Sequence, residues 1–494
     1  MNATKWAWGA GILLLLGYLA LSWIGIHSGI ATLDANGIMA VAGERLRTGA
    51  FDMSRPPGHP LNEYWLLPAY ARLLGERADI SPEVYGSYQL LGGLIALGSF
   101  WLLLAELPLS MTRKLLATAC LAFSPHFLFH SSDGEEFLWG MALIFAVLVI
   151  ISRLAKGQFS RPSLGWSFAA VAAVAASGFR VEFGAVALGI VFVTLLVSDR
   201  KWIEIGSLAL MVVALLGLLW WPVVQYHGTS MPFPNPISLQ VRFGVGLYKI
   251  IFHALGVLPL ILAVLILFQV RGRFGILPSA GQDILVYWIS RLVLVFFALF
   301  FAYPTKIEVV LPGVAFLVIW VALHAGERIW TGFVIACLMV QLVQIDCFEN
   351  RQWTGLKLEP SLWQQSLAKK PAFQGRLLES ASRMAREKRV VLTLKVWPWD
   401  FAWQKRHGFP FGAPVVISKG QDMPIAYHLG EGILASRSIL DNPELLAALS
   451  RQGYMVQIDQ DLYREVFLRY NLAAPTPSHA KVDGIDYQVV KLNP

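Results

Sequence analysis

The stretch that decides the fold is WAWGAGILLLLGYLALSWIGIH at Trp6–His27, which is followed at residues 28–37 by the polar segment SGIATLDANG. The apolar run holds no Asp, Glu, Lys or Arg, and it is long enough to cross a bilayer as one helix, which needs about 20 residues. No small-residue cleavage signature follows it, so we expect a retained membrane helix instead of a removed signal peptide.

The composition of the whole chain agrees with that first helix. Of the 494 residues 56% are hydrophobic and only 15% are charged, which is more apolar surface than one water-soluble core can bury. The net charge of +8 is typical of basic cytoplasmic loops that meet lipid headgroups, and it does not imply nucleic acid. Three cysteines supply no disulfide framework and no zinc spacing.

The hydropathy pattern predicts an all-α membrane bundle of about 11 transmembrane helices. Several of the runs are short, which is typical of broken or re-entrant helices. The expected spans are residues 6–27, 88–107, 115–129, 137–155, 164–177, 183–197, 203–223, 247–270, 284–303, 307–324 and 329–345.

Charge asymmetry between loops predicts the orientation. A cytoplasmic N-terminus places most loop cations on the cytoplasmic side, as the positive-inside rule requires. These cations are Lys5, Arg113, Lys114, Arg153, Lys156, Arg161, Arg200, Lys201, Arg271, Arg273 and Arg328. The C-terminal tail is then extracytoplasmic. It holds no Asn-x-Ser/Thr sequon, which is consistent with a bacterial inner membrane and a periplasmic tail.

The sequence divides into a membrane domain at 1–347, with a long first outer loop at 29–87, and an extracytoplasmic α/β domain at 348–494. Strands are expected at 390–394, 414–417, 454–458 and 487–492, and a helix that begins at Asn442-Pro443 and ends at Gly453. We therefore predict a small soluble α/β module behind the bundle.

Acids and bases gather at the outer ends of the expected spans, and Asp34 is the first of them. It follows the first span closely, so partial desolvation could raise its basicity toward that of a general base. The alternative is that Asp34 caps a helix at 37–46. We favour catalysis, and one residue could do both.

The outer loop continues through Arg55-Pro56-Pro57-Gly58-His59-Pro60-Leu61, whose prolines and glycine predict a corner. The corner would lay residues 61–74 on the membrane surface as an interfacial helix. His59 could touch a phosphate or a sugar, or could simply be solvated.

Ser131-Ser132-Asp133-Gly134-Glu135-Glu136 places three acids before the fourth span. A helix cap explains Asp133 alone, but three acids in four residues exceed what a cap needs. A divalent cation bound through carboxylates, or a contact to a sugar hydroxyl, is the sharper hypothesis.

Three cations complete the candidate set. Arg180 interrupts an apolar stretch and could clamp a phosphate, or could pair locally with Glu182. Lys306 reaches the outer face beside the tenth span and could meet a lipid phosphate. Arg291 lies inside the ninth span, where it would face a cavity or partner or would snorkel to the cytoplasmic surface.

Taken in order, these landmarks resemble the GT-C glycosyltransferase superfamily, which includes protein O-mannosyltransferases and aminoarabinose transferases. The landmarks are an acid after the first helix, the Arg-Pro-Pro-Gly-His-Pro-Leu corner, acids before span four and Lys-Ile-Glu-Val-Val-Leu-Pro-Gly at residues 306–313. The resemblance covers the membrane portion. It departs from many members in that Asp34 has no adjacent second acid, which leaves a metal requirement open.

The resemblance implies sugar transfer from a polyprenyl-phosphate carrier such as undecaprenyl phosphate to a protein, lipid or glycan acceptor. Asp34 would be the catalytic base, and Asp133, Glu135 and Glu136 the second acidic motif. Arg55, Arg180 and Lys306 would bind the lipid phosphate, supported by His59, Glu182 and Arg291. No cofactor is certain. A divalent cation on Asp34, Asp133 and Glu135 is one alternative for the acids. A polytopic transporter or flippase of lipid-linked sugars is the alternative function.

Overall fold

The computed structural model describes residues 3–28, 33–49, 59–77, 80–132, 134–198, 201–227, 239–270, 283–302, 307–349 and 352–368, together with short strands between 390 and 491. The chain divides into two compact units. The first comprises residues 1–28, 86–219 and 236–368, and the second comprises residues 29–85, 220–235 and 369–494. The predicted domain boundary at 347 stays a prediction.

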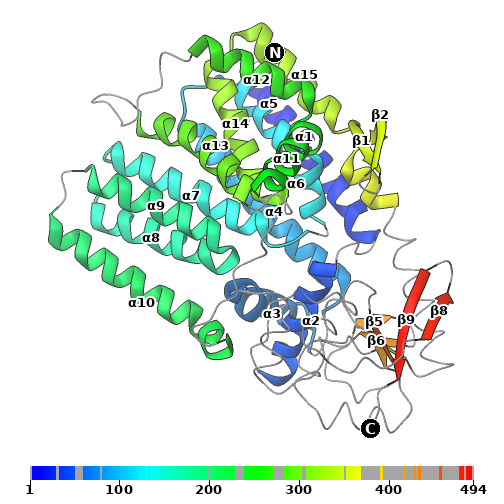
Figure 1. Cartoon of the computed structure of the whole chain (residues 1–494). Coiled ribbons are helices and arrows are strands. Elements are labelled where there is room, and N and C mark those ends of the chain that lie inside the picture. The colour runs from blue at the N-terminus through cyan, green and yellow to red at the C-terminus, as the bar shows by residue number, and fades with distance from the viewer. Residues whose placement is uncertain are drawn as a thin grey trace. The chain divides into compact units, whose positions relative to one another are not determined.

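The first unit is mostly helical (Figure 1). Its elements, two of which extend by a few residues into the second unit, are α1 (Ala3–His27), α4 (Pro82–Ala105), α5 (Met111–Ala122), α6 (Pro125–His130), α7 (Phe137–Ala155), α8 (Pro162–Phe179), α9 (Val181–Leu196), α10 (Trp202–His227), α11 (Leu239–Lys249), η2 (Ile250–Ala254), α12 (Val257–Val270), α13 (Ile284–Ala302), η4 (Ile307–Val310), α14 (Leu311–His324), α15 (Glu327–Val340), β1 (Val343–Glu349) and β2 (Gln352–Pro360).

Apolar side chains dominate the sequences of these helices, and they also pack the helices against one another. The helices α7, α8 and α9 lie side by side (Figure 1). A chain of buried aromatic rings links α7, α9, α13 and α14, because neighbouring centroids lie 5.4 to 6.1 Å apart, within the range for favourable ring pairs. The rings belong to Phe137, Phe183, Phe296, Phe316 and Phe145.

Seven helices of the described residues are long and apolar enough to cross a membrane, or eight if one bent pair counts as a span. The chain is therefore an integral membrane protein, but the expected eleven spans are not confirmed. The run at 115–129 is split into α5 and α6 by Ser124-Pro125, because Ser124 caps α6 and proline starts it. The helices α9 and α15 fall short of a full span, with 16 and 14 residues. The run at 247–270 bends by 105° next to Gly256.

Ion pairs show which helix ends lie together at the end of the bundle expected to be cytoplasmic. Glu106, just after α4, binds Arg153 and Lys156 at the end of α7 at 2.9 and 2.7 Å. Burial opposes the charge on Glu106, but hydrogen bonds from Lys156 and Arg153 outweigh it and lower the pKa of Glu106. Arg113 binds Glu327 at 2.9 Å. This clustering supports the predicted orientation, which stays a prediction.

The second unit holds α2 (Leu33–Thr48), η1 (Pro60–Leu66) and α3 (Leu67–Leu73), followed by β3 (Val390–Leu392), β4 (Ile417–Ser418), β5 (Tyr427–Leu429), β6 (Gly432–Leu434), β7 (Met455–Ile458), β8 (Ser478–Val482) and β9 (Ile485–Lys491). One sheet has the order β3-β7-β9-β8, in which β3 and β7 are parallel, and another has the order β4-β6-β5. Strands thus occur at or beside each predicted position. The predicted helix at 442–453 lies outside the described residues, so the α/β class stays a prediction.

The predicted helix at 61–74 is present as η1 and α3. Pro60 starts η1, and Trp65, Leu66 and Leu73 expose apolar surface. Exposed Trp and Leu suit a helix that lies at a lipid–water boundary, and that location stays a prediction.

Candidate functional site

The candidate site lies where three helix ends of the first unit meet. Glu135 and Glu136 occupy the last turn before α7, and Arg180 stands at the corner between α8 and α9. The backbone of Arg180 is extended, with φ −149° and ψ 123°, which ends one helix and starts the next. The corner therefore turns the Arg180 side chain toward the start of α7.

Arg180 contacts three carboxylates. Its Nη2 and Nε lie 2.6 and 2.8 Å from Oε1 of Glu182, and its Nη1 lies 3.2 Å from Oε1 of Glu136. Oε2 of Glu135 lies 3.7 Å from the same Nη1. The guanidinium also lies 4.3 Å from the ring centre of Phe137, a cation–π distance. The local pair with Glu182 that the sequence allowed is thus present as one part of a larger cluster.

The cluster is deeply buried, since the side chain of Glu136 is 0% exposed and that of Arg180 is 11% exposed. Buried ions are costly unless they are paired, so this arrangement is held by its mutual contacts. Among the described residues, one guanidinium thus lies among three carboxylates. Carboxylates placed in this way can stabilise a cation or a positively charged transition state.

A histidine and a fourth carboxylate adjoin the cluster. The backbone N–H of Glu135 donates to Nδ1 of His130 at 3.1 Å, and Nε2 of His130 lies 3.7 Å from Oε1 of Glu308 in η4. Nε2 of His126, one turn earlier on α6, lies 3.1 Å from the backbone oxygen of His253. The contact between His130 and Glu308 brings η4 to the same helix ends as the Arg180 cluster.

An aromatic stack borders these charges. The ring of Trp139 lies 4.8 Å from that of Tyr88 on α4 and 5.7 Å from that of Phe179, nearly parallel to the latter. Next to Tyr88, the amide of Gln89 is buried, and neither its oxygen nor its nitrogen has a hydrogen-bond partner among the described residues. The stack places apolar aromatic surface on residues close to Arg180 and Glu136 in sequence.

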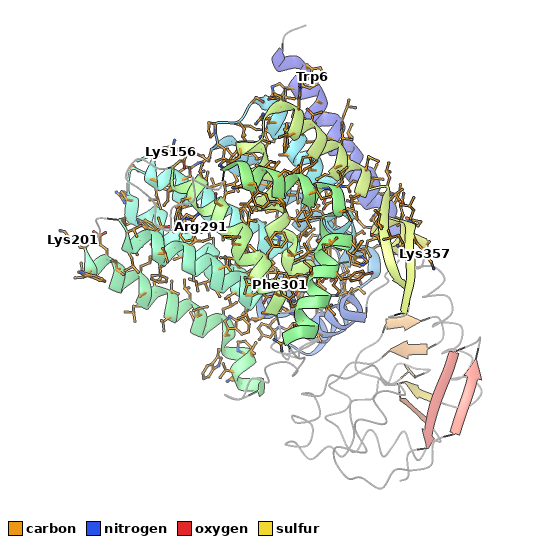
Figure 2. All side chains as sticks on the ribbon, turned by 45° about the horizontal axis from the view of Figure 1, so that its top comes forward. Trp6, Lys156, Lys201, Arg291, Phe301 and Lys357 are labelled. Carbon is orange, nitrogen blue, oxygen red and sulfur yellow. The ribbon has the colours of Figure 1, made fainter. Side chains whose placement is uncertain are left out.

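Four predicted site residues are brought together, namely Glu135, Glu136, Arg180 and Glu182. Two other predicted site residues have contacts of their own. His59 is buried in the second unit, and its backbone N–H donates to Glu63 at 3.3 Å, so the solvated alternative does not hold. Arg291 lies on α13 with its guanidinium 4.7 Å from the ring centre of Tyr287, and Figure 2 labels it on the helical bundle.

The remaining predicted residues are only partly visible. Asp34 is the second residue of α2, so it lies inside the helix and does not cap it, but its side chain lies outside the described part of the chain. Arg55, Asp133 and Lys306 also lie outside the described residues. No group of three or more potential metal ligands occurs among the described residues. The predicted cation site on Asp34, Asp133 and Glu135 therefore stays a prediction.

Our sequence prediction did not include His126, His130, Tyr88, Trp139 or Gln89 among the site residues. The two histidines stand four residues apart on α6, a spacing that places both on one helix face and could have drawn attention to them. Glu308 entered the sequence analysis only as part of the Lys-Ile-Glu-Val-Val-Leu-Pro-Gly segment at residues 306–313. Gln89 and Trp139 carry no local signal, because a glutamine and a tryptophan are ordinary near the ends of membrane helices.

Comparisons with known proteins give similarity to solved structures, among them that of ArnT. No protein-family model matches the chain, and no curated protein matches it. The crystal structure of ArnT from Cupriavidus metallidurans in the apo state is similar over 100% of this chain and 99% of its own, with a TM-score of 0.42 and 12% sequence identity. A similarity at this level carries no conclusion about activity, so function is inferred from the side chains themselves.

Proposed function

We propose that the chain is a membrane glycosyltransferase of the GT-C type that transfers a sugar from a polyprenyl-phosphate carrier to a protein, lipid or glycan on the periplasmic face. The observation that carries this proposal is the buried Arg180 cluster at the helix ends of an integral membrane protein. Burying charged side chains costs free energy, and membrane proteins that retain such groups usually use them for function.

The three carboxylates around Arg180 support transfer of a glycosyl group. Glycosidic bond cleavage passes through a transition state with positive charge on the sugar ring, which nearby carboxylates stabilise. In the proposed reaction Asp34 takes the proton of the acceptor nucleophile as that nucleophile bonds to the anomeric carbon. The bond from the anomeric carbon to the phosphate oxygen breaks, and the phosphate leaves with the electron pair.

Lys306 and Arg55 are proposed to meet the negative charge that grows on the departing phosphate, together with Arg180. Because Arg180 is already opposed by three carboxylates, its share of this role depends on the other cations or on a divalent ion. A divalent ion on the acids would supply charge neutralisation there. Metal removal with a chelator, followed by Mg²⁺ or Mn²⁺ addition, tests the divalent ion. Activity that the chelator abolishes and the metal restores indicates the ion, and unchanged activity indicates the side-chain cations.

One observation favours the alternative of a lipid-linked sugar flippase. The helices from Arg242 to Phe268 are bent by 105° at a short break, and transporters often bind their substrates at such interrupted helices. A flippase would move the carrier across the bilayer without consuming it, so the two functions differ in whether the donor is cleaved.

The test uses purified protein in nanodiscs with a panel of undecaprenyl-phosphate-linked sugars and peptide, lipid and glycan acceptors. The expected result is release of undecaprenyl phosphate, measured by mass spectrometry. In Asp34→Asn, kcat should fall by about 10²- to 10⁴-fold with donor binding retained, and Asp34→Glu should keep part of the activity, as for a general base.

The matched control is Glu327→Gln, which removes an acid from the opposite helix ends. Its side chain is 76% exposed, so the variant should transfer sugar like the wild type. Undiminished release of carrier by Asp34→Asn would remove Asp34 from the mechanism. Translocation of intact donor by the wild type, with no release, would establish the flippase instead.

A further inference from the structure

The contacts of His130 go beyond those of a core histidine. Its side chain is 1% exposed, and it ends α6 immediately before the acidic loop at residues 133–136. Two segments far apart in sequence contact its two ring nitrogens. One is the acidic loop, and the other is η4, which follows the segment that holds Lys306.

The loop is fitted closely to the histidine ring. Nδ1 of His130 accepts the backbone N–H of Glu135 at 3.1 Å. A Cβ atom on Gly134 would collide with Nδ1 and with the backbone of His130, so only glycine allows the loop to lie this close. The ring of His130 also lies 5.4 Å from that of Phe137, the first residue of α7. His130 therefore fixes the backbone from which Glu135 and Glu136 reach Arg180.

The hydrogen bond to Glu135 also determines the tautomer of the ring. Because Nδ1 accepts a hydrogen bond from the backbone N–H of Glu135, it carries no proton itself, and the proton of the neutral imidazole is on Nε2. Nε2 faces Oε1 of Glu308 at 3.7 Å. The ring thus accepts a hydrogen bond from the loop and turns its N–H toward Glu308 of η4, at a separation longer than a direct hydrogen bond.

We propose that His130 is a positioning residue that holds the acidic loop through Nδ1 and ties it to η4 through Nε2, so that the two segments keep one relative geometry. The proposal rests on the proposed function in that these segments carry Glu135, Glu136 and Lys306. The link itself consists of contacts within the first unit and can be measured without any catalytic assay.

The test uses the full chain in nanodiscs and two variants that each keep one half of the link. In His130→Asn the side-chain oxygen replaces Nδ1, so the bond to Glu135 is kept and the reach to Glu308 is lost. In His130→Gln the terminal amide replaces Nε2, so the reverse holds. Hydrogen–deuterium exchange of peptides that cover residues 134–137 and 307–310 reports the two halves separately.

Asparagine should leave exchange at 134–137 close to that of the wild type and speed exchange at 307–310. Glutamine should speed exchange at 134–137 by about tenfold, as expected when a buried hydrogen bond is lost. Equal effects of the two variants at both segments, or no effect of either, would overturn the proposal.

Glu308 provides an independent pair of variants that leave His130 in place. Glu308→Gln keeps an acceptor for Nε2–H and should leave exchange at 307–310 close to that of the wild type, whereas Glu308→Ala should speed it and leave 134–137 unchanged. An Ala variant that exchanges at 307–310 like the Gln variant contradicts the tie to η4, even if the His130 variants do not fold.

Sugar transfer gives the second readout. His130→Gln should lower kcat severalfold with little change in the KM for the donor, because it disturbs the acids and not the carrier lipid, and His130→Asn should recover most of that loss. If exchange behaves as expected but the wild type transfers no sugar, the proposed function fails and the positioning role stands. If the wild type transfers sugar but exchange is unchanged, the positioning role fails alone.

Discussion

At the scale of single residues, the first unit holds both paired and unpaired buried polar groups. Arg180 contacts three carboxylates, whereas the amide of Gln89 in α4 is buried and has no hydrogen-bond partner among the described residues. A buried polar group without a hydrogen bond costs about 1–3 kcal/mol.

Replacement of Gln89 by Met should therefore stabilise the protein, because it removes two unpaired polar atoms at nearly constant volume. We expect the Tm in detergent to rise, with a gain of about 1–3 kcal/mol at most. Gln89→Glu should lower the Tm, since it buries a charge or a protonated acid in the same place. A fall in Tm for the Met variant would show that the amide has a partner in the membrane.

The residues of the site were only partly predictable. Glu135, Glu136, Arg180 and Glu182 were recognisable because charges at the ends of apolar runs are conspicuous. His130 and Gln89 were not, since their importance depends on contacts with segments elsewhere in the chain. For Asp34 the structure adds the position in α2, and its role rests on the variant test.

At the scale of elements, the hairpin of α8 and α9 shows how the Arg180 corner is held. A Cβ atom on Gly184 would collide with Cβ and Cα of Ser177, so the two helices approach at backbone distance. Small residues permit such close contacts between membrane helices. The contact lies one turn from Arg180 on each helix and therefore fixes the direction of its side chain.

Gly184→Ala should separate α8 from α9 and disturb the corner. We expect a lower Tm and a loss of transfer, because the neighbouring atoms include backbone that cannot move aside. Gly189→Ala on the same helix is the control, since nothing lies within 4 Å of the added methyl group, and alanine there should be neutral or slightly stabilising. Equal behaviour of the two variants would contradict the close approach.

The elements also show where hydropathy fails. Hydropathy located most long apolar helices. The run predicted at 164–177 lies within α8, which is a full 18-residue helix. It read α5 and α6 as one span and missed the bend beside Gly256, because an averaged apolar signal does not register a cap or a left-handed glycine. It also extended the last span into what is β1.

At the scale of the whole molecule, the distribution of charge over the helix ends predicts the orientation in the membrane. The ion pairs of Glu106 and Arg113 gather the loop cations at one set of helix ends, and the Arg180 cluster lies at the other ends of α7, α8 and α9. The positive-inside rule assigns the former to the cytoplasm. The Arg180 cluster would then lie on the periplasmic side.

Cysteine labelling tests this assignment. Lys201, before α10, and Lys357, on β2, are both exposed and are labelled in Figure 2. In a background with Cys120, Cys337 and Cys347 replaced by Ala, a membrane-impermeant maleimide should label Lys357→Cys in intact cells and Lys201→Cys only after permeabilisation. The reverse pattern would place the candidate site in the cytoplasm and exclude periplasmic transfer.

The sequence alone determined that this protein resides in a membrane and that its charges lie at helix ends, because hydropathy and charge act locally along the chain. Only the tertiary structure decided that Arg180 meets Glu135 and Glu136 and that His130 lies between Glu135 and Glu308. These contacts depend on how intervening helices pack against one another, and packing is set by the shapes of many side chains at once and not by any local pattern.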